Sequence, residues 1–290
     1  MKKIKLLLCL FMLTTLCGCS NSNKNESSKT LNAAMFWIST SLDPTNNYDG
    51  WVLSRIGVGE TLLKLNEKYE VEPCLAKSYE QIDDTTWKLT LKDSITFSNG
   101  KKVTGENVKS CLERAFEKNT RAIDYFDLNH VEAKGQDIYL YLNKSSGAIL
   151  NNLCEPLFTI YDASQSEEDI ANHPLCTGPF VVDDFVSEKT IDTSKNKKYY
   201  DGKAKLDHVH FSQVTDSDAR VLALQSGEVD LANTIDYSSL KLFRNNKDYQ
   251  VLEVLGPRTN VIYMNNETTY LSDLTIRKAL SYSVNRKSIV

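Results

Sequence analysis

The sequence predicts an α/β protein, because strand and helix patterns alternate along the chain without an internal repeat. Residues 206–232 carry a strand pattern, a helix pattern and a second strand pattern, as in a βαβ unit with parallel strands. Period-two alternation at 87–91 and 138–142 predicts half-buried strands. The 290 residues, of which 41% are apolar and 25% charged, suffice for two ordinary globular domains.

The first thirty residues predict an export signal followed by a tether. Lysines near the start precede an apolar stretch at 6–16, which fits a secretory signal and is too short to span a bilayer. This stretch runs into Leu-Cys-Gly-Cys at 16–19, which resembles a bacterial lipobox. We therefore expect a signal peptide at 1–18 and acylation of Cys19, with an ordinary secretory signal as the alternative. Residues 20–29 lack apolar side chains, so 19–30 should form a flexible tether.

The region after the tether predicts a strand, a turn and then a capped helix. Residues 31–38 have a strand pattern, and Asp and Pro predict a turn at 41–45. Asn99 and Gly100 predict a tight turn between extended segments. Thr104 is expected to cap a helix. The buried stripe of that helix comprises Val108, Cys111, Leu112, Ala115 and Phe116.

Within the βαβ unit, residues 208–211 and 228–232 should form strands on either side of a helix. Asp216 or Asp218 can cap this helix, and Gly227 suits the positive φ at its end. Its apolar side chains are Ala219, Leu222 and Ala223. Another helix should begin near Asp273 and still be running where the sequence stops, with a face made by Ile276, Ala279, Leu280, Ser283 and Val284.

The cysteines beyond position 19 leave the redox state open. Cys74, Cys111, Cys154 and Cys176 allow three pairings, and export permits a disulfide without requiring one. Cys111 lies on the apolar helix face, where a buried free thiol is expected.

Charge and motif content exclude several classes of function. The formal net charge of −4 and the absence of a dense Lys/Arg cluster after residue 5 argue against a nucleic-acid partner. The common catalytic and nucleotide-binding motifs do not occur, so we expect neither an enzyme nor a cofactor. His208 and His210 should project from one side of a strand, but two histidines without a third ligand do not predict a metal site.

Nine stretches resemble one family, the extracytoplasmic solute-binding proteins of peptide and nickel importers, called family 5. Examples are SLDPT at 41–45 and ALQSGEVDL at 223–231. The stretches follow the family's order and span nearly all of the chain from residue 31. They are residues 41–45, 59–63, 72–78, 84–91, 97–100, 177–180, 205–209, 223–231 and 277–289.

The resemblance implies a periplasmic-binding-protein fold of class II, or cluster C, in which two α/β lobes close on a ligand. Residues 31–62 and 177–257 would form the N-terminal lobe, and 63–176 an inserted subdomain. Residues 258–290 would begin a second lobe that is mostly missing, because family members have about twice this length. We therefore expect a truncated chain that binds solute poorly alone.

The resemblance also places candidate ligand-binding residues. Tyr48 and Trp51 occupy positions that face the cleft in the family, although Trp51 can equally be a core residue. Asn233 and Thr234 follow a strand whose loop faces the cleft, with an ordinary polar loop as the alternative. Arg258 could pair with a ligand carboxylate or form a structural ion pair. Nickel-binding members use a tryptophan and an arginine from the inserted subdomain and nearby loops. The corresponding stretch here, 153–157, has no arginine, which argues against nickel without excluding it.

The function implied is solute capture outside the membrane and delivery to an ABC permease. Short peptides rank first as the ligand and a nickel or other metal chelate second. The partners would be the ligand, the permease and, through acylated Cys19, membrane lipid. A surface lipoprotein that senses or chaperones peptides without transport is the alternative class, and permease genes beside this one would argue against it.

Overall fold

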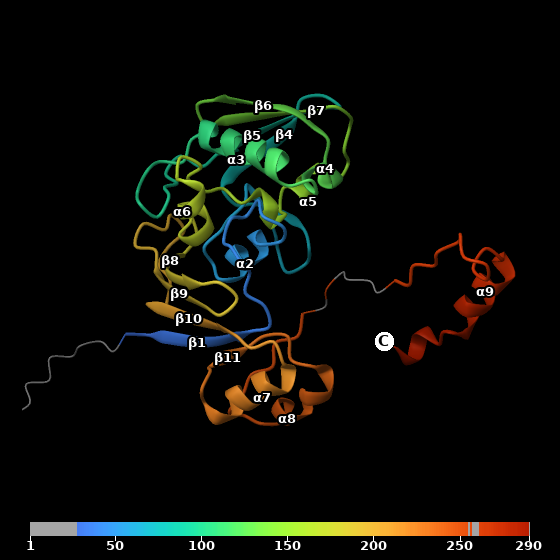
Figure 1. Ribbon diagram of the computed structural model, residues 1–290. Helices are drawn as coiled ribbons and strands as arrows, with labels where there is room; N and C mark the ends of the chain where they lie inside the picture. Colours follow the sequence, from blue (N-terminus) through green and yellow to red (C-terminus); the bar gives the residue numbers. More distant parts are fainter. Residues whose placement is uncertain (1–27, 255, 257–260, 290) are drawn as a thin grey trace, which may run out of the picture. The chain divides into compact units, whose positions relative to one another are not determined.

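The computed structural model describes residues 28–254, 256 and 261–289 (Figure 1). Cys19 and Arg258 lie outside the described residues. The chain divides into two compact units, one ending at Ser239 and the other beginning at Leu240. The predicted domain boundaries at 62/63, 176/177 and 257/258 stay predictions.

The first unit contains a five-stranded sheet in the order β11-β1-β10-β9-β8. Its strands are β1 (Thr30–Met35), β8 (Phe180–Val186), β9 (Thr190–Lys195), β10 (His208–Gln213) and β11 (Leu231–Ala232). β1 pairs in parallel with β10 and β11, whereas β9 pairs antiparallel with β10 and β8. Helix α7 (Ser217–Ser226) joins β10 to β11, which confirms the predicted α/β class.

Two predicted strands are shorter in the structure. β1 ends at Met35 instead of residue 38, because side chains accept the next backbone bonds. Phe36 N–H donates to Asn233 Oδ1 at 3.0 Å, and Ile38 N–H donates to Gln213 Oε1 at 2.5 Å. The strand predicted at 228–232 is reduced to the two residues of β11.

Helix α7 has the predicted ends but a different buried face. Asp216 caps its start through Ala219 N–H at 2.8 Å, and Gly227 ends it with φ at +75°. Leu222, predicted on the apolar face, is 65% exposed, and the buried side chains are Arg220 and Val221. The prediction failed because the guanidinium of Arg220 binds backbone carbonyls inside the protein, so the face of α7 that carries Arg220 is the one that is buried.

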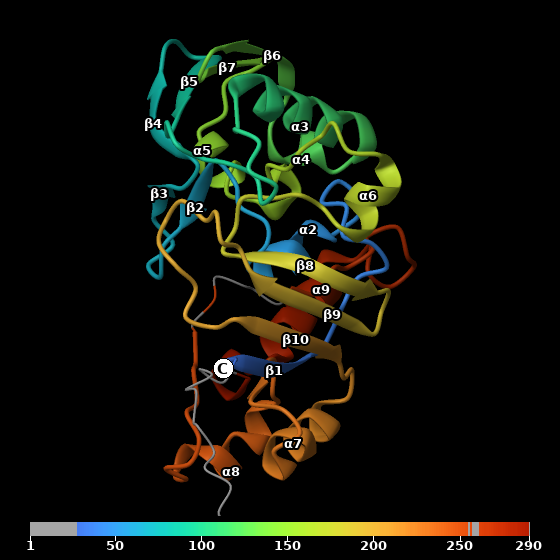
Figure 2. The same ribbon diagram turned by 90° about the vertical axis from the view of Figure 1, so that its left-hand side faces the viewer.

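A second, four-stranded antiparallel sheet has the order β4-β5-β7-β6. Its strands are β4 (Ala76–Gln81), β5 (Thr86–Leu91), β6 (Leu128–Lys134) and β7 (Asp137–Leu142). Helix α3 (Gly105–Lys118) runs across one face of this sheet, as both views show (Figures 1 and 2). The predicted stripe Val108, Cys111, Leu112 and Ala115 is buried, and Thr104 forms a capping box with Asn107.

The remaining elements of the first unit are short. They are α2 (Gly50–Arg55), β2 (Leu63–Leu65), β3 (Val71–Pro73), α4 (Ala122–Tyr125), α5 (Ile149–Asn152), η1 (Pro156–Phe158), α6 (Glu167–Asn172) and η2 (Tyr237–Ser239). β2 pairs with β3. Fully buried side chains from both sheet regions form one continuous core, among them Ile38, Leu53, Leu75, Leu89, Phe97 and Tyr161.

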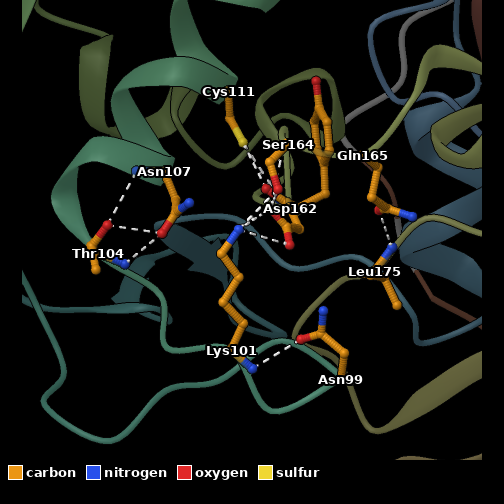
Figure 3. A network of polar contacts seen from close by, with 10 residues as sticks. Asn99, Lys101, Thr104, Asn107, Cys111, Asp162, Ser164, Gln165 and Leu175 are labelled. Carbon is orange, nitrogen blue, oxygen red and sulfur yellow. Dashed lines mark hydrogen bonds and ion pairs between the residues drawn. The ribbon is translucent and has the colours of Figure 1, made fainter.

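Buried polar contacts fasten the segments around this core. Asp43 receives a bidentate ion pair from Arg114 of α3, at 2.9 and 2.6 Å. Figure 3 shows a second network, in which Lys101 Nζ lies 3.0 Å from Asp162 Oδ1 and donates to Ser164 Oγ at 2.8 Å. The Cys111 thiol donates to the Tyr161 carbonyl at 3.1 Å. The cysteines at 74, 111, 154 and 176 are free, and Cys111 is buried as predicted.

The second unit contains α8 (Lys241–Arg244), α9 (Leu274–Ser283) and η3 (Arg286–Ser288). Asp273 caps α9 through Thr275 N–H at 2.7 Å, as predicted for its start. The prediction that this helix runs on to the last residues is wrong, because Val284 has extended backbone and ends it. Ile276 and Leu280 on its apolar face are 37% and 44% exposed.

Candidate functional site

The candidate site begins at the edge of the five-stranded sheet where β1, β10 and β11 end. These strands are parallel, so their carboxyl ends meet at one edge. The loops that follow them start at Phe36, Val214 and Asn233. Ligands of α/β proteins usually bind at such an edge, because the loops there are free to carry side chains that suit a ligand.

The buried side chain of Arg220 links the loop after β10 to the loop after β11. Its side chain is 3% exposed and donates only to backbone carbonyls among the hydrogen bonds of the described residues. The acceptors are Val214 at 2.6 Å, Thr215 at 2.9 Å, Asn233 at 3.0 Å and Thr234 at 2.6 Å. A guanidinium has five N–H donors in a fixed plane, so it can fix the spacing of several carbonyls at once. Sequence reasoning missed this residue.

Asn233 and Thr234 lie in the loop that Arg220 holds. The Asn233 amide oxygen accepts the bond from Phe36 N–H, so this side chain links the loops after β1 and β11. Thr234 is exposed and has φ at +54°, a left-handed conformation that few residues adopt outside glycine. Ligand contact by either residue stays a prediction.

Trp51 lies on the surface of α2 instead of in the core. Its ring is 38% exposed, and its Nε1–H donates to Glu155 Oε1 at 2.9 Å. The Arg55 guanidinium, one helical turn further on, lies 5.5 Å from the centroid of the Trp51 ring. A tryptophan held by a hydrogen bond and a cation–π contact keeps one orientation while leaving ring surface open to solvent.

Tyr48 is covered by an arginine that sequence reasoning also missed. The Arg121 guanidinium lies 3.7 Å from the centroid of the Tyr48 ring, and Tyr48 is 54% exposed. Arg121 donates to the Asn47 carbonyl at 2.8 Å and to the Tyr125 hydroxyl at 2.7 Å. Its Nη2 lies 3.9 Å from Glu155 Oε1. The stretch 153–157 has no arginine of its own, but the fold brings Arg121 to it.

Tyr48, Trp51, Arg55, Arg121 and Glu155 together form what we call the aromatic–arginine surface. It adjoins the sheet edge through Phe36, whose ring centroid lies 5.5 Å from the Arg55 guanidinium. Phe36 is in turn bound by Asn233. A chain of contacts therefore connects four of the predicted residues, Tyr48, Trp51, Asn233 and Thr234. Arg121 and Glu155 come from segments 70 and more residues away, and no local pattern marks them.

The carboxylate of this surface is mostly buried. The Glu155 side chain is 13% exposed, and its Oε1 lies 3.9 Å from Arg121 Nη2. Burial, with the negative charge of Glu155 next, raises the pKa of Tyr125 to about 12, so that its hydroxyl stays protonated. Below the surface, burial raises the pKa of Asp49 to about 6, although the Asn46 amide donates to its carboxylate at 2.6 Å. The arrangement can therefore hold a carboxylate or another anion between flat rings.

Metal-binding side chains are not gathered anywhere in the described part of the chain, where no group of three His, Cys, Asp or Glu residues could hold an ion. His210 Nδ1 lies 2.6 Å from Asp192 Oδ1, and His208, two residues earlier on β10, is exposed. Across the same described residues, each helix is too short or too polar to cross a membrane.

Comparisons with known proteins agree with the fold. Residues 70–290 match the model of bacterial extracellular solute-binding proteins, family 5 middle. The nickel-binding protein NikA of Staphylococcus aureus is 32% identical over 274 residues, which is 94% of this chain and 54% of that protein. The glutathione-binding protein GsiB of Salmonella paratyphi A is 27% identical over 239 residues, 79% of this chain and 46% of that protein.

Solved structures give the same result. NikA from Staphylococcus aureus in complex with Ni(L-His)2 superposes with a TM-score of 0.72 at 33% identity, covering 76% of this chain and 46% of that one. The nickel ABC transporter structure from Bacillus halodurans has a TM-score of 0.73 at 28% identity, covering 91% and 55%. The chain thus spans about half the length of the relatives it matches.

Seven of the nine sequence stretches, from 72–78 onward, fall within the residues that match the family model. The match confirms the prediction of a solute-binding protein instead of an enzyme. The fold, the sheet edge and the match over residues 70–290 lead to one conclusion: the chain belongs to the bacterial extracellular solute-binding proteins of family 5.

Proposed function

We propose that this chain is the solute-binding component of an ABC importer and that its solute is a nickel complex of a small organic chelator such as histidine. The observation that carries the proposal is the 33% identity to NikA of Staphylococcus aureus, whose structure holds Ni(L-His)2. Short peptides ranked first on sequence alone. The comparisons reverse that order, because the nickel-binding relative matches more of the chain at higher identity than the glutathione-binding one.

The aromatic–arginine surface supports a chelate as the ligand. An amino-acid chelate presents carboxylates and, with histidine, flat imidazole rings around the metal. Arg55 and Arg121 can bind carboxylates, and Trp51 and Tyr48 can stack on imidazole. In this arrangement the chelator supplies the ligands of the metal, and the protein recognises the chelator.

Delivery would follow from closure of two lobes around the solute, with the closed form recognised by the permease. In this scheme Arg220 keeps the loops after β10 and β11 in place, so that these loops already have their final arrangement when the lobes close. The signal and lipobox-like sequence at 1–19 support an extracytoplasmic location with acylated Cys19 as the membrane anchor. A Cys19→Ser variant that stays in the membrane fraction would remove the anchor from the proposal.

The test of the ligand is a thermal shift of the full-length protein with three additives. Nickel with a twofold excess of L-histidine should raise the melting temperature as concentration increases, because a ligand of the native state stabilises it by mass action. Nickel alone and a pool of di- to pentapeptides should raise it less. A larger shift with the peptide pool than with nickel–histidine would overturn the proposed ligand while leaving the importer role in place.

A short peptide is the second candidate, and the similarity to GsiB favours it. The same two arginines could bind a peptide carboxylate, and Trp51 could stack on a peptide side chain. Glutathione, added as a fourth additive in the thermal-shift test, distinguishes the two candidates, because it carries carboxylates without an imidazole.

A further inference from the structure

A loop opposite the candidate site concentrates positive charge in an otherwise acidic chain. Residues 194–207, the end of β9 and the loop that joins it to β10, contain five lysines and two aspartates, whereas the formal net charge of the whole chain is −4. The expectation that no dense lysine cluster follows residue 5 is therefore wrong for this loop. Five lysines of the loop and Lys29 form what we call the lysine edge: Lys29, Lys195, Lys197, Lys198, Lys203 and Lys205.

The lysine edge lies where the parallel strands begin. Lys29 precedes β1, and its carbonyl accepts from Asp207 N–H at 2.8 Å. Asp207 also pairs with Lys195 at the end of β9. The loop therefore meets the start of β1 and β10, at the edge of the sheet opposite Phe36 and Asn233. Figure 2 shows this loop leaving β9 and returning to β10.

Several of these lysines are free to meet an outside anion. All six are exposed. Lys195 is neutralised by Asp207, and Lys198 donates to the Asn99 carbonyl at 2.8 Å. No ion pair joins Lys197, Lys203 or Lys205 to a carboxylate within the described residues. Unpaired, exposed like charges repel one another and are best stabilised by a surface of opposite charge.

The chain also enters the sheet at this edge. Ten residues, 20–29, separate Cys19 from the first strand. Ten residues of fully extended chain span at most about 33–36 Å. An anchor at Cys19 would thus hold the lysine edge within a few Debye lengths of the bilayer, each about 8 Å at physiological salt.

We propose that the lysine edge binds the anionic phospholipid surface of the membrane to which the chain is anchored. The bound state turns the carboxyl ends of β1, β10 and β11 away from the bilayer, so that the candidate site faces the source of solute. Anionic headgroups attract lysines near the surface in this way without a specific pocket. The proposal rests on acylation of Cys19 as proposed above, and its test separates the two.

The test is lysine acetylation of the full chain, read by mass spectrometry, in vesicles of phosphatidylcholine alone or with 30% phosphatidylglycerol. We expect labelling of Lys197, Lys203 and Lys205 to fall at least threefold in the anionic vesicles and to recover in 0.5 M NaCl. Lys109, Lys134 and Lys144, around the four-stranded sheet, should label equally in both. Flotation with the neutral vesicles reports on the anchor alone.

A charge-reversal variant provides the matched comparison. Lys197→Glu, Lys203→Glu and Lys205→Glu together should abolish the protection of Lys29, whereas Lys109→Glu, Lys134→Glu and Lys144→Glu together should preserve it. Equal labelling of the lysine edge in neutral and anionic vesicles would overturn the proposal. Equal protection by glycerol phosphate without vesicles would also overturn it, because the partner would then be a free phosphate.

Discussion

Arg114 and Arg121 have different partners. Arg114 belongs to the framework around the core, whereas Arg121 belongs to the aromatic–arginine surface. They are seven residues apart, at α3 and just after it. Arg114 makes a bidentate ion pair with Asp43 and also binds Thr45 and Tyr161, with its side chain 14% exposed. Arg121 covers the exposed ring of Tyr48, and its nearest carboxylate oxygen lies at 3.9 Å.

The difference shows that the use of an arginine follows from its partners more than from its place in the sequence. A guanidinium such as that of Arg114, which binds both oxygens of a carboxylate and two hydroxyls, has few donors left for a ligand. One that lies over an aromatic ring keeps part of its fork available. The same contrast holds for the two aspartates nearby, Asp43 and Asp49.

The largest effect is expected from breaking the pair of Arg114 and Asp43, whose side chains are 14% and 13% exposed. Arg114→Met leaves the mostly buried Asp43 carboxylate without its cation, and loss of one partner of a buried pair costs about 3–5 kcal/mol. Urea unfolding should show this, with Lys118→Met as the matched control. Lys118 pairs with Glu167 on the surface, where a pair is worth at most about 1 kcal/mol. Equal losses in the two variants would remove the distinction between framework and surface.

The second effect concerns the two aspartates and pH. Burial alone would raise the pKa of Asp43, but hydrogen bonds from Arg114 and Thr45 outweigh it and the pKa is lowered. Asp49 has no such cation, and burial raises its pKa to about 6. A carboxyl with a raised folded pKa binds its proton more tightly when folded, so its contribution to stability declines as pH rises from about 4 to 6.

Asp49→Asn should therefore stabilise the protein at pH 7 by about 1–3 kcal/mol and have little effect at pH 4. The amide can still accept the bond from Asn46. Thermal unfolding of both proteins between pH 4 and pH 7.5 measures the difference. A gain that is the same at every pH would contradict a titrating Asp49.

A smaller change in stability is expected at Trp51. Because the ring is 38% exposed, Trp51→Ala should cost only about 1 kcal/mol, through the lost hydrogen bond to Glu155 and the contact with Arg55. The same unfolding experiment checks this. A variant that fails to fold would place Trp51 in the core after all.

Local sequence patterns predicted much of the framework, because caps and periodicity act over a few residues. Thr104 and Asp216 cap the starts of α3 and α7, and Gly227 ends α7, all as expected. β5 and β7 lie where the alternation predicted strands. The face of α7 was mispredicted, since Arg220 has a polar side chain whose acceptors belong to two other loops.

The candidate site was less predictable for the same reason. Tyr48 and Trp51 were proposed as candidates from the family resemblance. Their partners Arg121 and Glu155 come from separate segments, and only the packed fold brings them together. The role of Asn233 in linking two loops likewise depends on the pairing of β1 with β11.

The central claim is that the aromatic–arginine surface recognises a nickel chelate, and calorimetric titration of nickel–histidine into full-length Arg121→Gln tests it most directly. The variant should lose at least tenfold in affinity, about 1.4 kcal/mol, while its melting temperature stays near that of the parent. Lys118→Gln, the control on the same helix region, should bind as the parent does. Unchanged affinity in Arg121→Gln would contradict the claim.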